Sequence, residues 1–399
     1  MSLSPLMKAA LILSLIGSLL VGAYAVEEAL GTNPDRFDLT DYHPIYIAGQ
    51  LAGSGRFEDA YHLKTMLKLE EELGGHKVLM PWAYPPVYGF LAAPLAMLGL
   101  IPGFLLFGAA SGLLFVVALR RLGGEDAWPV LLASFMSLML NLRCGQNGLM
   151  MGGFMALAAA AVLRNQSVRA GGALALMAFK PHLAIGMPFV LLLHRRWTTI
   201  AVAAVGAVGL TGASIAVFGL DTFRAFLAGF AEVRHLMTVG AYPFNRMATV
   251  YGFGSSIGLP AGAALALHLA VAAAVVGFAA RAVLRAPDLR TQLGLAICAG
   301  LFVTPYIHDY DLTQFSVGIV LLAPELQRRL GPNLYARLLV ALGFVQAYGF
   351  ATSFQYGPDK HGVTLSLMGP GLLAVFVAVL RTLGRTPDPA VAPAEPVPA

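Results

Sequence analysis

Long apolar segments, separated by short stretches that carry arginine, constrain this chain more than any other feature of its sequence. The first runs from Leu6 to Val26, about 21 residues, which suffices to cross a bilayer. Of the 399 residues, 58% are hydrophobic and 12% are charged. Ordinary soluble domains have about 25% charged residues. A soluble core of this size could not hide so many apolar side chains from water, so the bilayer must solvate most of the chain.

The positions of arginine predict how the chain crosses the membrane. Lys and Arg concentrate in cytoplasmic loops, so residues 220–260 and 304–311, which lie between arginine-rich stretches, are predicted to be outside. The first segment could be a secretory signal peptide, but its length favours a retained helix. Both termini are then cytoplasmic. The net charge of +5 does not indicate nucleic-acid binding, because the basic residues are scattered between apolar runs.

Residues 84–194 allow two arrangements. If charge decides, Arg120-Arg121, Arg164 and Arg195-Arg196 all lie inside, and short outward hairpins connect them. The hairpin tips then fall near Arg143–Asn147 and at Lys180-Pro181, and residues 84–119 need a kinked or partly interfacial helix before they cross. Five full spans in plain alternation would instead put Arg120-Arg121 outside. We favour the hairpins. Either arrangement gives an all-α integral membrane protein, a polytopic helical bundle of about twelve membrane segments, some short or broken.

One long hydrophilic stretch, residues 27–80, precedes the tail. It holds ten of the chain's 21 acidic residues, so a large first outer loop is predicted there. Within it, Tyr61–Leu73 has a helical pattern, typical of an interfacial helix or of a packed surface helix. We therefore expect one membrane domain over residues 1–381 and a disordered cytoplasmic tail over residues 382–399.

Two motifs border this loop. Asp41 lies close behind the first span and before the apolar stretch Ile45–Leu51, so its carboxylate could cap a helix or act as a general base. Trp82-Ala83-Tyr84-Pro85-Pro86 closes the loop. Two prolines and two interfacial aromatic residues suit a structural role where the chain enters lipid.

Three further motifs place polar groups within or between apolar segments. Arg143, Gln146 and Asn147 lie in the stretch Asn141–Asn147, which would need a broken helix facing a polar cavity. Lys180 begins Lys180-Pro181-His182. A charge at membrane depth costs about 2.5–3.5 kcal/mol, so it indicates function unless the lysine snorkels to the interface. The stretch Thr304–Asp311 contains His308, Asp309 and Asp311, whose spacing supports a solvated turn or a substrate contact better than a metal site.

Taken together, these motifs resemble a bacterial membrane family. They are Asp41 with Tyr46, Ala48 and Gly49; Tyr84–Pro86; Gly145–Asn147; Ala178–His182; Arg195–Trp197; and Thr304–Asp311. The motifs follow one another in this order over about residues 8 to 380. In this respect the chain is similar to the polyprenyl-phosphate-mannose-dependent α-mannosyltransferases of the GT-C superfamily.

The resemblance implies a GT-C-type glycosyltransferase in the bacterial inner membrane, with its active site on the periplasmic face. The donor would be a sugar linked to a polyprenyl-phosphate carrier, with mannose as the first expectation. The acceptor would be a glycan or a glycolipid. Asp41 matches the family's catalytic aspartate, with Asp38 as a local rival. Displacement would invert the anomeric centre. The phosphate and substrate candidates are Lys180, Arg143, Arg246, His308, Asp309, Asp311, Gln146, Asn147 and Tyr84. Enzymes of this superfamily differ in metal use, and no residue pattern in this sequence demands a metal or a cofactor.

A transporter or flippase of a lipid-linked sugar is the alternative function. Such a protein would also place polar residues in a cavity near the midplane. No inverted repeat is visible in the sequence, and the polar motifs cluster toward one face of the membrane. Both observations favour an enzyme.

Overall fold

The computed structural model describes residues 41–74, 79–239, 241–353 and 365–384. Within these ranges the regular structure is helical, and a β-bridge joins Met247 to His308. The predicted first span and most of the predicted disordered tail lie outside the described residues.

Apolar helices long enough to cross a membrane make up the body of the protein. Among the described residues, four helical segments satisfy this criterion: Leu100–Ala133, Trp197–Phe218, Ala261–Arg285 and Asp309–Ser353. In the same described ranges, five shorter apolar helices accompany them: Pro86–Met97, Gly148–Leu163, Ser167–Phe179, Pro181–Leu193 and Met368–Gly384. The predicted helical membrane architecture is thereby confirmed. The predicted number of about twelve membrane segments remains a prediction.

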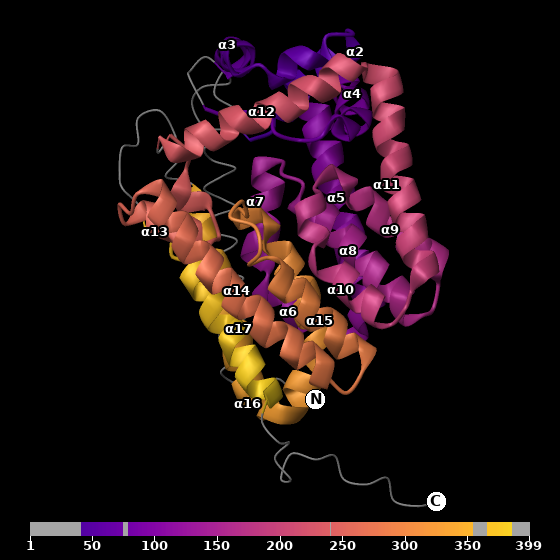
Figure 1. Cartoon of the computed structure of the whole chain (residues 1–399), viewed down its shortest axis with the longest axis vertical. Helices are drawn as coiled ribbons and strands as arrows, with labels where there is room; N and C mark the ends of the chain where they lie inside the picture. Colours follow the sequence, from indigo (N-terminus) through magenta and orange to yellow (C-terminus); the bar gives the residue numbers. More distant parts are fainter. Residues whose placement is uncertain (1–40, 75–78, 240, 354–364, 385–399) are drawn as a thin grey trace, which may run out of the picture.

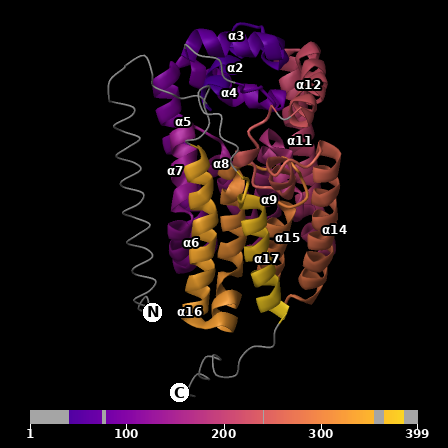
Figure 2. The ribbon, with the colours of Figure 1, turned by 90° about the vertical axis from the view of Figure 1, so that its left-hand side faces the viewer.

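The helices form an upright bundle covered at one end by a transverse layer (Figures 1 and 2). The bundle contains α5 (Leu100–Gly123), α6 (Ala127–Ala133), α7 (Phe135–Cys144), α8 (Gly148–Leu163), α9 (Ser167–Ala175), α10 (Gly186–Leu193), α11 (Trp197–Phe218), α14 (Ala261–Arg285), α15 (Leu289–Gly300), α16 (Thr313–Ser353) and α17 (Met368–Gly384). The transverse layer contains α2 (His43–Gly53), α3 (Leu63–Gly74), α4 (Gly89–Met97) and α12 (Leu220–Thr238), and the short α13 (Val250–Ser256) lies beside the bundle. The chain reverses within α16 at Gly331, whose φ of +69° suits glycine, directly before Pro332.

Contacts between turns agree with the hairpin arrangement of the middle region and not with plain alternation. Arg164 Nη2 donates to the carbonyl oxygen of Arg121 at 2.8 Å, and Arg196 Nη1 donates to Asn165 Oδ1 at 2.6 Å. All these turns therefore lie at the same end of the bundle. The transverse helix α4 precedes α5, as the length of residues 84–119 predicts.

The tip of the first hairpin requires glycine at residue 145. Gly145 follows α7 with a φ of +64°, a left-handed conformation that side chains disfavour. A Cβ there would lie 2.9 Å from the rings of Phe104 and Tyr42. This tight reversal allows the next residue, Gln146, to reach the interior at the height of the hairpin tip.

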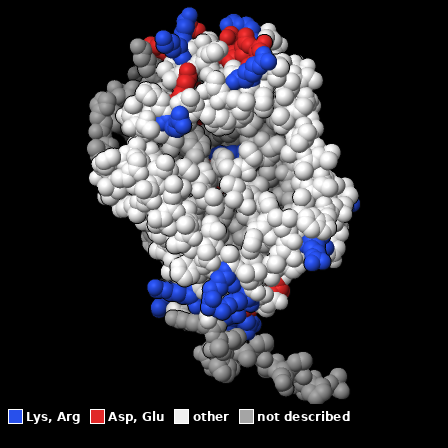
Figure 3. Space-filling model, in the orientation of Figure 1, with Lys and Arg blue, Asp and Glu red and all other residues white. Residues whose placement is uncertain are grey.

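Charged side chains gather at the two ends of the molecule, and the surface between them is largely uncharged on the face that Figure 3 shows. The lower end there is mainly basic, whereas the end beside α2 and α3 carries both signs. Large apolar side chains, among them Leu113, Val208 and Phe278, are exposed on the bundle helices. Such a band suits contact with lipid hydrocarbon.

Candidate active site

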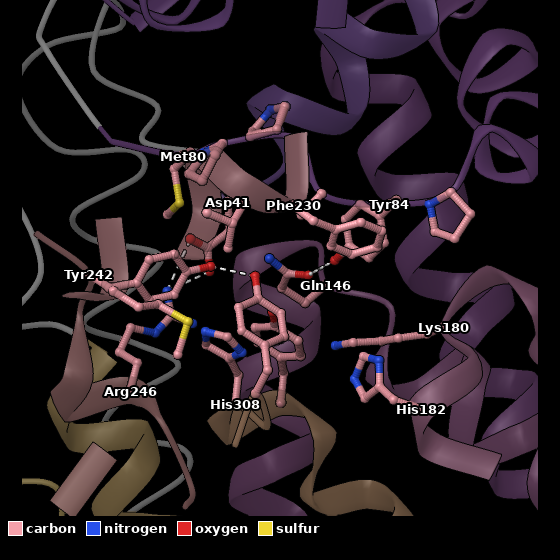
Figure 4. A pocket seen from close by; sticks show the side chains of 18 of the residues that line it. Asp41, Met80, Tyr84, Gln146, Lys180, His182, Phe230, Tyr242, Arg246 and His308 are labelled. Atoms are coloured by element: carbon pink, nitrogen blue, oxygen red, sulfur yellow. Dashed lines mark hydrogen bonds and ion pairs between the residues drawn. The ribbon is translucent and has the colours of Figure 1, made fainter. Parts of the chain in front are cut away.

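A cavity of about 380 Å³ lies between the transverse layer and the two hairpin tips. Figure 3 shows a hollow below α12 with Lys or Arg atoms visible inside, and Figure 4 shows the lining side chains. Six residues singled out from the sequence line it: Asp41, Tyr84, Gln146, Lys180, Arg246 and His308. The fold thus brings together residues that are more than 260 positions apart in the chain.

Arg246 joins two buried carboxylates. Its Nη1 donates to both oxygens of Asp41, at 2.7 and 3.0 Å, while Nε and Nη2 donate to Asp309 at 2.8 and 3.2 Å. Arg246 is 4% exposed and Asp41 6% exposed. Charge-assisted hydrogen bonds of this kind fix the orientation of the carboxylate. Asp41 is therefore held at the cavity wall. Asp309, which does not line the cavity, holds Arg246 in place.

The helix-cap interpretation of Asp41 is not supported. The helix α2 begins at His43, its N-cap residue is Tyr42, and no side chain forms a cap hydrogen bond. Pro44 occupies the first turn and has no N–H that would need a partner. The carboxylate of Asp41 is directed to Arg246 instead.

Lys180 forms a second buried ion pair. Its Nζ donates to both oxygens of Asp311, at 2.6 and 2.8 Å, and lies 4.5 Å from the centre of the Tyr310 ring. The side chains of Lys180 and Asp311 are 4% and 0% exposed. Lys180 therefore does not snorkel to the bundle surface: it is directed into the cavity (Figure 4). A buried cation needs such a partner to offset its loss of hydration.

The other predicted site residues lie beside or away from the cavity. Asp309 and Asp311 contact it through Arg246 and Lys180, but do not line it. Arg143 donates to Ser353 Oγ at 3.0 Å, and Asn147 Nδ2 lies 3.5 Å from the Tyr88 hydroxyl. Neither Arg143 nor Asn147 lines the cavity.

Three tyrosines that line the cavity were not among the site residues predicted from the sequence, although two of them belong to the motif Thr304–Asp311. Tyr242, Tyr306 and Tyr310 surround His308, whose ring stacks on Tyr310 with centroids 5.3 Å apart. The hydroxyls of Tyr242 and Tyr306 hydrogen-bond to each other. Burial raises the pKa of Tyr306 to about 12. Burial also lowers the pKa of His308 well below its ordinary value, aided by the positive charges of Lys180 and Arg246, so its imidazole is neutral.

One side of the cavity is apolar. The amphipathic helix α12 contributes Phe226, Phe230, Val233 and Met237, with Arg234 as its one charged lining residue, and residues 79–81 add Leu79, Met80 and Pro81. Opposite them lie the charged and hydroxyl groups. A cavity with one apolar and one charged wall suits an amphiphilic ligand. Among the residues that the structure describes, no three His, Cys, Asp or Glu side chains are grouped to hold a metal ion.

These features define a helical membrane protein with a charged, partly apolar cavity at one end of its bundle. The chain belongs to glycosyltransferase family 87, whose sequence model matches residues 82–305, more than half of the chain. This assignment fits the predicted resemblance to GT-C-type membrane glycosyltransferases. Comparisons with curated proteins and with solved structures gave no match. The protein is a membrane glycosyltransferase.

Proposed function

We propose that this glycosyltransferase transfers a sugar, mannose above all, from a polyprenyl-phosphate carrier to a hydroxyl of a glycan or glycolipid. The observation that carries the proposal is the placement of Asp41 and Lys180 on opposite sides of one cavity (Figure 4). A carboxylate can accept the acceptor's proton, and a cation can stabilise a departing phosphate. The apolar wall formed by α12 suits the lipid portion of a substrate.

The proposed reaction is a single displacement. The acceptor oxygen forms a bond to the anomeric carbon while its proton moves to the Asp41 carboxylate. The bond from the anomeric carbon to the phosphate oxygen breaks, and its electron pair stays on the polyprenyl phosphate. Attack and departure on opposite faces invert the configuration. Arg246 positions Asp41, while Lys180 stabilises the growing negative charge of the phosphate.

The direct test is sugar transfer by the purified full-length protein from synthetic polyprenyl-phosphate mannose to a panel of glycan and glycolipid acceptors. We expect a mannosylated acceptor of inverted anomeric configuration, detected by mass spectrometry and NMR. A parallel assay in liposomes measures movement of the donor between leaflets. Movement without transfer to any acceptor would support the alternative, a flippase, and contradict the proposal.

We further propose that the cavity faces the periplasm and that both termini are cytoplasmic. The mainly basic end of the bundle, opposite α2 and α3, supports this orientation, because Lys and Arg concentrate on the cytoplasmic side. The enzyme would then take its donor from the outer leaflet of a bacterial inner membrane.

Single cysteines test this orientation. Ser54 follows α2 and Asn333 follows the reversal in α16, and both are exposed. In a background with Cys144→Ala and Cys298→Ala, we expect Ser54→Cys to react with an impermeant maleimide in cells with a permeabilised outer membrane. Asn333→Cys should react only after the inner membrane is lysed. The reverse pattern would place the cavity on the cytoplasmic side.

A further inference from the structure

The cavity leaves two buried imidazole nitrogens without a hydrogen-bond partner in the described part of the chain. They are Nε2 of His182 and Nδ1 of His308. Several other polar groups of the wall are paired, since Asp41 bonds Arg246, Lys180 bonds Asp311 and Gln146 bonds Tyr84. Buried polar atoms in folded proteins are nearly always paired, and these two belong to residues that line the cavity, where a bound ligand would supply a partner.

The ring of His182 has a defined place at the wall. It belongs to the short helix η6 (Pro181–Ala184), two residues after Lys180. It packs edge-on against the Tyr306 ring, with centroids 6.2 Å apart and an interplanar angle of 81°. Tyr306 is itself fixed by the hydroxyl of Tyr242. His182 thus lines the cavity beside Lys180, and its Nε2 is buried and without a partner among the described residues.

The positions of the charged groups indicate which part of the donor His182 meets. Inversion requires the attacking oxygen and the departing phosphate to lie on opposite sides of the anomeric carbon. Asp41 and Arg246 lie on one side of the cavity, and Lys180 and His182 lie on the other (Figure 4). His308 lies nearer to Arg246. The departing phosphate therefore belongs at the side of Lys180 and His182.

Lys180 alone has few hydrogen-bond donors left for this phosphate. An ammonium group has three protons, and Nζ already donates to both oxygens of Asp311. About one donor then remains for a phosphate with two non-bridging oxygens. A second donor beside Lys180 would satisfy the other oxygen, and the unpaired Nε2 of His182 is available in the adjoining helix η6.

We infer that His182 is a phosphate-binding residue for the polyprenyl-phosphate donor, with Nε2–H donating to a non-bridging phosphate oxygen beside Lys180. The inference rests on the proposed function. It assigns the phosphate to the imidazole of His182 and not to that of His308, which is also a phosphate candidate from its sequence motif.

Binding of sugar-free polyprenyl phosphate to the purified full-length protein tests this inference. His182→Phe keeps a ring against Tyr306 but removes both nitrogens, so we expect the Kd to rise about tenfold or more, as for a lost hydrogen bond to a charged group. His182→Gln can place its amide nitrogen near the position of Nε2 and should recover part of the affinity. His182→Asn reaches the position of Nδ1 instead and should recover less.

His268 offers a matched control. It is buried in α14, and it does not line the cavity. His268→Phe makes the same chemical change, and the Kd for polyprenyl phosphate should stay within about twofold of the wild-type value.

The outcomes distinguish failure of the proposed donor from failure of the role of His182. A wild-type protein that does not bind polyprenyl phosphate would overturn the proposed donor itself. A wild-type protein that binds it, together with His182→Phe of equal affinity, would overturn only the role of His182. A larger loss in His308→Phe than in His182→Phe would also overturn it, by moving the phosphate to the other side. If His182→Phe does not fold, equal affinities of His182→Gln, His182→Asn and wild type would contradict the inference.

Discussion

Replacing Asp41 with Asn should leave a folded protein that binds donor and transfers almost no sugar. The amide keeps the shape of the side chain and an oxygen for Arg246, but it cannot accept the acceptor's proton. Loss of a general base lowers rates by about 10²–10⁴-fold. We expect this loss in kcat with the purified enzyme, with little change in the affinity for polyprenyl phosphate.

Asp309→Asn is the matched control for Asp41→Asn. It removes one negative charge from the same ion-pair network, because Arg246 bonds both carboxylates, but Asp309 does not line the cavity. We expect Asp309→Asn to lose much less activity, through poorer positioning of Arg246. Near wild-type transfer by Asp41→Asn would contradict the role of Asp41. Asp38, outside the described residues, would then be the base if Asp38→Asn were inactive.

Replacing Lys180 with Met should harm both stability and catalysis. The change leaves the buried Asp311 carboxylate without its cation, which costs about 3–5 kcal/mol in comparable buried pairs. It also removes the cation proposed to stabilise the departing phosphate, so kcat/KM for the donor should fall about 10²–10³-fold. Thermal unfolding in detergent and donor kinetics measure the two effects independently.

The double variant Lys180→Met/Asp311→Asn separates these effects. It removes both charges of the pair, so the melting temperature should recover most of its loss. Donor use should stay impaired, because the phosphate still lacks its cation. A double variant with wild-type kcat/KM would show that Lys180 serves only to neutralise Asp311.

Some of the site could be selected from sequence because buried charge is rare in lipid. Lys180, His308 and Asp311 each interrupt apolar segments, where an unpaired charge has no hydration to offset its cost. That argument identifies candidates but not partners. Lys180 and Asp311 are 131 positions apart, and nothing in either motif indicates that each would neutralise the other.

Other assignments depended on local packing that no periodicity reveals. The predicted helix around residues 61–73 is present as α3, yet Glu70, the first of three consecutive glutamates, is 2% exposed. Burial raises its pKa to about 8, whereas Glu71 and Glu72 are exposed. Likewise Arg143 was selected as a cation near the membrane, but α7 directs it to Ser353.

The sequence by itself determined the membrane class, the helical architecture and the polar motifs, because the hydrocarbon solvent tolerates few alternatives to apolar helices and penalises each unpaired charge. Only the tertiary structure decided which of these motifs meet. The left-handed turn at Gly145, the start of η6 at Pro181 and the position of α12 bring Gln146, Lys180 and an apolar wall to one cavity. These are contacts between distant segments, and their free energy depends on shape and charge complementarity that local sequence does not encode.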